Sequence, residues 1–281
     1  IRGASVLLVE DNVFSQQVGQ ELLEDAGATV CVANNGREAL DLLEKEHFDC
    51  VLMDIQMPVM DGYETTRQIR ANPRLAGMLV IAMTANAGRE DQQRCIDAGM
   101  DEFVTKPIAP KQLFDMLARW MSQRALHQAA QAAQVAAPAA AAQNAILAAL
   151  EAAAQPAPAA ALPPHAELVD VAALAQTFNG NRQKMHKFAA LFLRTARDSM
   201  AELDAALAAG DLRQLSELGH RIKSSARAVG AMPFGELCLA LEHIQRDGDL
   251  ARAGALVAAL HAMLERLDQH MLSDLAAHAA G

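Results

Sequence analysis

The chain has 281 residues, of which 52% are hydrophobic, 21% are charged and 4% are aromatic, and its formal net charge is −10. This length suits about two domains of roughly 100–200 residues each. Both halves of the chain are acidic, which argues against direct nucleic-acid binding, and no run of about 20 apolar residues could span a bilayer.

The first 124 residues alternate short apolar runs with helical patterns. Strands are predicted at residues 4–9, 28–33, 47–53, 78–84 and 101–105, and helices at 13–26, 36–45, 63–71, 88–98 and 111–124. In the first helix, Val18, Leu22 and Leu23 are predicted to share one inward face. Five strands that alternate with helices require a parallel sheet with right-handed crossovers. The sequence therefore predicts a doubly wound α/β domain with a five-stranded parallel sheet over residues 1–124.

The rest of the chain contains a linker and a helical domain. Residues 125–166 are rich in Ala, Pro and Gln and lack the large apolar residues of a core, although residues 139–154 could be helical between prolines. Helices are then predicted at residues 169–177, 182–209, 212–229, 233–246 and 250–272, separated by Gly-containing breaks. Short turns between long helices predict an all-α four-helix bundle at 167–275, with a short tail at 276–281.

Polar side chains follow four of the predicted strands at their carboxyl ends. They are Glu10 and Asp11, Asp54, Thr84, and Lys106. In a doubly wound sheet these ends face one crevice. Crowded carboxylates need a cation, and hard oxygen ligands suit Mg²⁺. Because Asp can act as a nucleophile toward phosphorus, phosphoryl transfer is the chemistry that this set favours over simple solvated loop residues.

The segments VLLVEDN, LMDIQMPVMDG, AMTAN and FVTKP resemble the receiver domain of two-component response regulators, which has a flavodoxin-like fold. The resemblance covers residues 4–124 and implies that Asp54 accepts a phosphoryl group. It also implies a magnesium site formed by Asp11, Asp54 and the backbone carbonyl of Gln56, with Glu10 acting mainly through water.

The same resemblance assigns roles to four further residues. Lys106 would pair with the phosphate, and Thr84 would turn to bond it on activation. A cis bond before Pro107 would bring the lysine into the crevice. Phe103 occupies the position of the aromatic switch and lacks the hydroxyl that a tyrosine would offer.

In the helical domain, the informative stretch is GHRIKSSARAVGA, residues 219–231. On a helix, His220, Lys223, Ser224 and Arg227 share one face, whereas Leu218, Ile222 and Val229 point to the core. An exposed imidazole beside cations is a poor metal ligand and a reasonable nucleophile. From this stretch alone, an ordinary surface histidine remains the alternative.

Residues 168–272 nevertheless resemble the histidine phosphotransfer (HPt) domain. The matches are the His-x-x-Lys spacing, Gly230-Ala231 and the segment FGELCLALEHIQRDGD. The family usually has Gly directly after the lysine, and Ser224 stands there in this chain, where it could slow transfer or narrow the choice of partner. Glu242 stands where some members carry Gln beside the phosphohistidine.

Together the two resemblances imply the carboxyl-terminal part of a hybrid sensor histidine kinase. We expect a phosphorelay in which an upstream histidine kinase core, in cis or in trans, phosphorylates Asp54. The group then passes to His220 and on to the receiver of a downstream response regulator. No ATP-binding motif of a kinase is present. Two alternatives are a regulatory binding module, in which the bundle only docks a partner, and a phosphate sink, in which His220 returns the group to Asp54.

We expect these domains to be cytoplasmic. The four cysteines have neither CxxC nor metal spacing and are expected to be reduced thiols. No signal peptide is visible. We expect the chain to be a fragment or processed form of a longer protein, an expectation compatible with a parent protein anchored in the inner membrane. No membrane contact is expected from these residues themselves.

Overall fold

The computed structural model describes residues 1–84, 88–120, 122, 168–178 and 180–277. The chain divides into two compact units, one formed by Ile1–Phe114 with Glu167–Gly281 and the other by Asp115–Ala166. In the second unit, residues 115–120 and 122 are described and are helical. The predicted linker at 125–166, including its proposed helix at 139–154, lies outside the described residues. The domain boundaries given above remain predictions.

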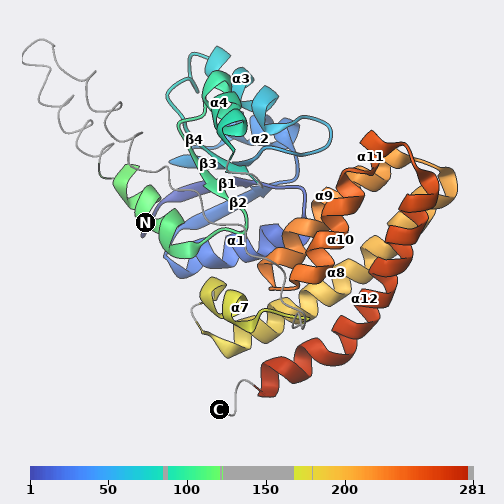
Figure 1. Cartoon of the computed structure of the whole chain (residues 1–281). Coiled ribbons are helices and arrows are strands. Elements are labelled where there is room, and N and C mark those ends of the chain that lie inside the picture. The colour runs from blue at the N-terminus through green and yellow to red at the C-terminus, as the bar shows by residue number, and fades with distance from the viewer. Residues whose placement is uncertain (85–87, 121, 123–167, 179, 278–281) are drawn as a thin grey trace, which may run out of the picture. The chain divides into compact units, whose positions relative to one another are not determined.

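The first unit begins with an α/β domain whose elements alternate as predicted (Figure 1). They are β1 (Ser5–Val9), α1 (Val13–Asp25), β2 (Thr29–Ala33), α2 (Gly36–Lys45), β3 (Cys50–Asp54), α3 (Gly62–Ala71), β4 (Leu79–Thr84), α4 (Arg89–Ala98) and β5 (Glu102–Thr105). Residues 110–120 are also helical. The five strands form one parallel sheet in the order β2-β1-β3-β4-β5, which confirms the doubly wound fold.

The central strands are buried on both faces, and this burial explains why they read as continuous apolar runs. Every residue of β3 and β4 is buried. One face of the sheet packs with α2, α3 and α4 in a core cluster that includes Leu7, Val51, Val80, Ile69 and Cys95. On the other face, Gly19 of α1 lies against Leu8 of β1, where an added Cβ would be 3.0 Å from the leucine side chain.

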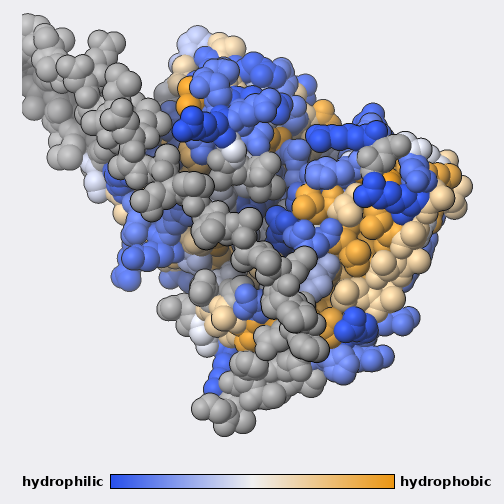
Figure 2. Space-filling view, in the orientation of Figure 1, coloured by the Kyte–Doolittle hydropathy of each residue, from blue (hydrophilic) through white to orange (hydrophobic). Residues whose placement is uncertain are grey.

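The first unit continues as a helical bundle. Its elements are α7 (Val171–Thr177), α8 (Arg182–Ala209), α9 (Leu212–Ala228), α10 (Met232–Glu242), α11 (Ile244–Asp247) and α12 (Leu250–Ala277). The four longest helices, α8, α9, α10 and α12, pack around a core that includes Phe188, Phe192, Phe234, Leu215 and Leu260. In Figure 2, hydrophobic residues gather over the visible part of this bundle, whereas the visible surface over α3 and α4 is mainly hydrophilic.

The predicted helix at 233–246 is wrong in one respect, because it is two helices. The chain turns at His243, between α10 and α11. The Ser216 hydroxyl on α9 donates a hydrogen bond to the carbonyl oxygen of Glu242. The backbone N–H of Arg246, which would bond that carbonyl in a continuous helix, instead bonds the carbonyl of His243 at 3.0 Å. At the other end of the bundle, α12 continues past the predicted end at residue 272 to Ala277.

Helices α9 and α10 approach closely at Gly219. A Cβ at this position would lie 2.9 Å from the carbonyl oxygen of Cys238 and 2.9 Å from the backbone nitrogen of Glu242. Both neighbours are backbone atoms, so they cannot move aside as a flexible side chain would. The glycine therefore fixes the distance between the two helices.

We predict that Gly219→Ala destabilises the protein by about 1–3 kcal/mol, because the extra methyl group forces the two helix backbones apart. Denaturant unfolding followed by circular dichroism measures the effect. Gly254→Ala in α12 is the matched control: its Cβ would meet only the side chain of Leu207, at 3.9 Å, so we expect a gain of about 0.5–1 kcal/mol from helix propensity. Equal effects at the two sites would contradict this account of Gly219.

Candidate functional site

The acidic side chains predicted to meet at the sheet edge do meet there. In the parallel register Val9 lies beside Met53, and Asp54 lies beside Met83, so β1, β3 and β4 end together. Carboxylate oxygens of Glu10, Asp11 and Asp54 lie within 4.8 Å of one another. Glu10 and Asp54 are buried, with 2% and 4% of their surfaces exposed.

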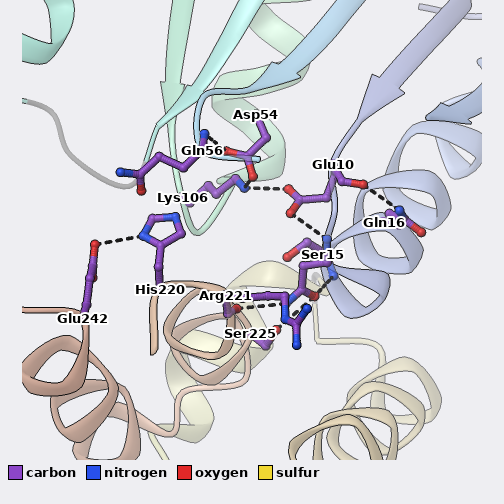
Figure 3. Close-up of polar contacts among 11 residues, drawn as sticks. Glu10, Ser15, Gln16, Asp54, Gln56, Lys106, His220, Arg221, Ser225 and Glu242 are labelled. Carbon is purple, nitrogen blue, oxygen red and sulfur yellow. Dashed lines mark hydrogen bonds and ion pairs between the residues drawn. The ribbon is translucent and has the colours of Figure 1, made fainter. Parts of the chain in front are cut away.

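A buried lysine neutralises part of this charge. Lys106 Nζ lies 2.7 Å from Asp54 Oδ2 and 2.6 Å from Glu10 Oε2, and its side chain is 8% exposed (Figure 3). The peptide bond between Lys106 and Pro107 is cis, as the receiver resemblance implies. The backbone N–H of Gln56 donates to Asp54 Oδ1 at 3.3 Å. Asp54 thus accepts hydrogen bonds on both of its oxygens.

Burial and neighbouring charges shift the pKa values of the groups in the crevice. Burial, and then the charge of Asp54, raises the pKa of Glu10 to about 8 despite the opposing effect of Lys106. The same two causes raise the pKa of Asp11. Burial lowers the pKa of Lys106, but the charges of Asp54 and Glu10 outweigh it and raise that pKa overall. A second cation is therefore favoured, and three carboxylates are the hard ligands that Mg²⁺ prefers.

Two further residues to which the receiver resemblance assigns a role, Thr84 and Phe103, lie in different surroundings. Thr84 ends β4, is 5% exposed and lines the same cleft as Asp54. Phe103 is half-buried and packs against the core cluster on the face of α2–α4. The structure thus brings Thr84 to the crevice, whereas Phe103 lies in the packing of the domain.

His220 has a carboxylate partner in the bundle. Its Nδ1 lies 2.9 Å from Glu242 Oε1, and Lys223 Nζ forms an ion pair with the other oxygen of the same carboxylate. A carboxylate only accepts hydrogen bonds, so Nδ1 carries the proton and Nε2 keeps the lone pair. Burial raises the pKa of Glu242, but the hydrogen bonds from His220 and Lys223 outweigh it and lower the pKa to about 2.

These contacts correct the expected surface character of the histidine face. The side chain of His220 is 16% exposed and that of Lys223 is 6% exposed, so neither is a solvated surface group. Lys223 holds Glu242 rather than presenting a free cation. Arg227 lines the cleft but pairs with Glu236 at 3.0 Å. Ser224 is half-buried, and its predicted effect on transfer stays a prediction. Leu218, Ile222 and Val229 are buried in the core as predicted.

One cleft joins the two sets of residues. A cavity of about 990 Å³ is lined by Asp11, Asp54 and Thr84 from the α/β domain and by His220, Arg221 and Lys223 from the bundle. Figure 3 shows the imidazole of His220 on the side of α9 that faces the crevice of Asp54 and Lys106. The charge of Arg221 also acts to lower the pKa of Asp11. The two candidate phosphoryl acceptors therefore share one space.

The residues that bring the two domains together were not predicted from the sequence. The side-chain amide of Asn12 donates to the carbonyl of Arg221 at 2.9 Å, and Ser225 Oγ donates to Asn12 Oδ1 at 3.2 Å. Asn12 also caps α1 through the N–H of Ser15. The position of Asn12 directly after two acidic site residues is the signal that could have identified it, although its partners come from a segment more than 200 residues later in the chain.

The packing of α1 was also predicted incompletely. Val18 and Leu22 do not share one face with Leu23; together with Phe14 they join the core cluster of the bundle. Phe14 meets Phe188 and Phe192 of α8 edge to face, with ring centroids 6.0 and 6.3 Å apart. The i, i+4, i+8 spacing of Phe14, Val18 and Leu22 is a second apolar stripe, visible in the sequence once two faces are sought.

Comparison with known families identifies both domains. Residues 6–118 match the response regulator receiver domain, and residues 187–270 match the Hpt domain. The chain joins a receiver domain to an Hpt domain. This combination is that of two-component phosphorelay signalling. Among the described helices, none has the length and apolar character needed to cross a membrane.

The relatives of the chain include hybrid sensor kinases. Sensor histidine kinase GacS from Pseudomonas protegens is 30% identical over 281 residues, which is 99% of this chain and 27% of that protein. The chain therefore spans about a quarter of the length of this relative. The receiver domain of sensor histidine kinase PA1611 from Pseudomonas aeruginosa, crystallised with a magnesium ion in its active-site cleft, is 38% identical and covers 43% of this chain and 98% of that chain, with a TM-score of 0.41.

A further solved structure is a complex of the two domain types. It is the co-crystal structure of the Saccharomyces cerevisiae histidine phosphotransfer protein Ypd1 with the receiver domain of Ssk1. The match is 27% identical and covers 42% of this chain and 89% of that chain, with a TM-score of 0.41.

The lowered pKa of Glu242 gives a prediction on acid stability. Because this pKa is about 2 in the folded protein and ordinarily 4.5, ionised Glu242 stabilises the fold above about pH 4.5. That contribution is lost as the pH falls from about 4.5 toward 2. We expect the stability difference between wild type and Glu242→Gln to shrink by about 1 kcal/mol between about pH 6 and pH 3.5.

Urea unfolding at the two pH values measures this difference. Glu236→Gln serves as the control, because Glu236 is exposed and pairs with Arg227 at the surface. A difference between wild type and Glu242→Gln that stays constant with pH would show that Glu242 keeps an ordinary pKa in the folded state.

Proposed function

We propose that this receiver–Hpt chain is an intermediate station of a phosphorelay, in which Asp54 receives a phosphoryl group and passes it to His220. The observation that carries the proposal is the shared cleft, which is lined by Asp54, the ion-pair partner of Lys106, and by His220 with its partner Glu242. Phosphoryl transfer needs in-line positioning and neutralisation of charge more than covalent assistance. Both requirements are supported by the groups in this cleft.

In the first transfer, a carboxylate oxygen of Asp54 attacks the phosphorus of a phosphohistidine on a histidine kinase core. The P–N bond breaks as the P–O bond forms, and the imidazole leaves with the electron pair. Lys106, which lies 2.7 Å from Asp54, offsets the charge on the phosphoryl oxygens. Thr84 lies at the same strand-end edge, and its hydroxyl serves as a donor to the acyl phosphate.

The acidic residues of the crevice would hold a divalent cation during this step. Glu10, Asp11, Asp54 and the backbone carbonyl of Gln56 are the groups that would hold Mg²⁺. When bound, the ion supplies positive charge to the phosphoryl oxygens. The excess of carboxylates over cations in the crevice supports this assignment.

In the second transfer, Nε2 of His220 attacks the acyl phosphate of Asp54. The P–O bond to Asp54 breaks, the P–N bond forms, and the carboxylate recovers the electron pair. The proton stays on Nδ1, where Glu242 accepts it in a hydrogen bond of 2.9 Å. The carboxylate of Glu242 also offsets the positive charge that the imidazole acquires when it is phosphorylated.

The wider assignment follows from the relatives. We infer that the chain works within a hybrid sensor histidine kinase, with a kinase core as phosphoryl donor and the receiver of a separate response regulator as final acceptor. The four cysteines are free thiols in the structure, which supports a reducing, cytoplasmic setting.

We predict that the relay is broken at different points by two substitutions. With a labelled, phosphorylated kinase core and Mg²⁺, Asp54→Asn takes up no label, because the first acceptor is missing. His220→Gln traps the label as acid-stable, alkali-labile aspartyl phosphate. Gel autoradiography after acid and alkali treatment distinguishes the two products. His261→Gln is the matched control and transfers normally, since His261 pairs with Asp204 away from the cleft.

Label on His220 in the Asp54→Asn protein, with no other receiver present, would contradict the order of transfer. Label that reaches Asp54 in wild type but never His220 would favour the binding-module alternative. Net flow from His220 to Asp54 would favour the phosphate sink.

A further prediction concerns the metal. Mg²⁺ at ten times its Kd should stabilise wild type by about 1.4 kcal/mol, because the ion binds the folded state alone. Asp11→Asn should lose most of this gain and should be more stable than wild type without the ion, since one carboxylate of the crowded set is gone. Thermal unfolding with and without Mg²⁺ measures both effects.

Asp91→Asn is the control for the metal experiment, because Asp91 lines the cleft but lies outside the carboxylate cluster. It should keep the full response to Mg²⁺. An equal response in Asp11→Asn and wild type would rule out this metal site.

A further inference from the structure

The contact between α1 of the receiver and the Hpt bundle has three parts along its length. At the start of α1, Asn12 forms hydrogen bonds with Arg221 and Ser225 of α9. Arg221 directly follows His220 in the sequence. The apolar stripe of Phe14, Val18 and Leu22 forms the middle. The last two turns of α1 carry Glu21 and Asp25, which form ion pairs with α8.

The ion pairs connect the end of one helix to the start of another. Lys184 forms an ion pair with Asp25 and lies 3.2 Å from Glu21, and Lys187 forms an ion pair with Glu21. Lys184 and Glu21 are 21% and 23% exposed in their side chains, so this pair is partly shielded from water. The three contacts form one small network rather than separate surface pairs.

The structure points to a role for this network in choosing partners. We propose that Lys184 and Lys187 select receivers by the charge at the end of their first helix, and that the chain's own receiver must leave before another receiver can reach His220. This proposal rests on the phosphorelay function proposed above. The preferred partner is a receiver with acidic residues at the positions that correspond to Glu21 and Asp25.

Charge is the part of this contact that can discriminate. An apolar stripe is non-directional and accepts many partner surfaces of similar size. A basic residue at either acidic position would instead face Lys184 or Lys187, and like charges across an interface are costly. The aromatic and apolar residues thus provide general adhesion, and the lysine pair provides selectivity.

The same contacts also keep a second receiver from binding the bundle while the chain's own receiver is bound. Ser225 and the backbone carbonyl of Arg221, on the helix that carries His220, are both engaged by Asn12 of the chain's own receiver. Phe188 and Phe192 are covered by Phe14. A second receiver that uses this surface needs the same positions, so receipt of the phosphoryl group and its delivery to a third domain alternate.

A transfer assay between two full-length variants tests the proposal. The donor carries His220→Gln, so that label stays on Asp54, and Lys184→Glu with Lys187→Glu, so that its own bundle repels its receiver. The acceptor carries Asp54→Asn, so that any label on its His220 comes from the donor. The donor is charged by a labelled kinase core and Mg²⁺ and is then freed of the kinase.

Four acceptors are compared. With native α1 the acceptor is blocked by its own receiver, and transfer is slow. With Glu21→Lys and Asp25→Lys that receiver is repelled, and transfer should be about fivefold faster. Adding Lys184→Glu and Lys187→Glu to this acceptor restores the internal pairing and should return transfer to the slow rate.

The fourth acceptor is the matched control, Glu24→Lys. It makes the same charge change on the same helix, at a residue that accepts a hydrogen bond from Gln20 within α1. It should behave like native α1.

Transfer to the Glu21→Lys, Asp25→Lys acceptor at or below the native rate would overturn the proposal. This outcome differs from failure of the relay itself, in which the wild-type chain alone passes no label from Asp54 to His220. The wild-type reaction is therefore run beside the assay. Circular dichroism of each variant confirms that the exposed substitutions leave the fold intact.

Discussion

The crowding of negative charge at the carboxyl edge of the sheet is the constraint on which the rest of the site depends. Glu10, Asp11 and Asp54 keep their carboxylates within 4.8 Å of one another, and Lys106 contacts two of them. One lysine cannot neutralise three carboxylates, and burial together with the charge of Asp54 raises the pKa values of Glu10 and Asp11. A crevice with this charge balance favours a bound cation.

In the bundle the charge balance is reversed, because basic groups outnumber the carboxylate. There one carboxylate, Glu242, is shared by two basic groups, His220 and Lys223, and its pKa is lowered rather than raised. The arrangement depends on backbone geometry, because Gly219 allows α10 to approach α9 until Glu242 reaches the imidazole. The bond from Ser216 to the carbonyl of Glu242 ends α10 at that residue. The histidine is therefore held in one tautomer by its neighbours before any partner binds.

Helix α1 packs against both the sheet and the bundle because it has two buried faces. Gly19 lies against the sheet, while Phe14, Val18 and Leu22 pack into the bundle. Residues at the start of α1 follow directly from Glu10 and Asp11, so the helix that packs on the bundle is continuous in sequence with the acidic residues of the crevice.

The amino-acid sequence by itself determined most of the elements, the order of the two domains and the gathering of acidic residues after the strands, because these depend on local periodicity and on residues at strand ends. The continuous apolar runs before Asp54 and Thr84 were sufficient to predict a parallel sheet and its crevice. Only the tertiary structure decided that Lys223 is buried, that Glu242 holds His220, that His243 divides a predicted helix, and that Asn12 meets α9. Each of these results depends on contacts between segments remote in the chain, such as Ser216 with Glu242 or Asn12 with Ser225. Local sequence patterns do not indicate which remote segment will form a hydrogen bond with a buried polar group. These hydrogen-bond partners are therefore decided by the packing of the segments.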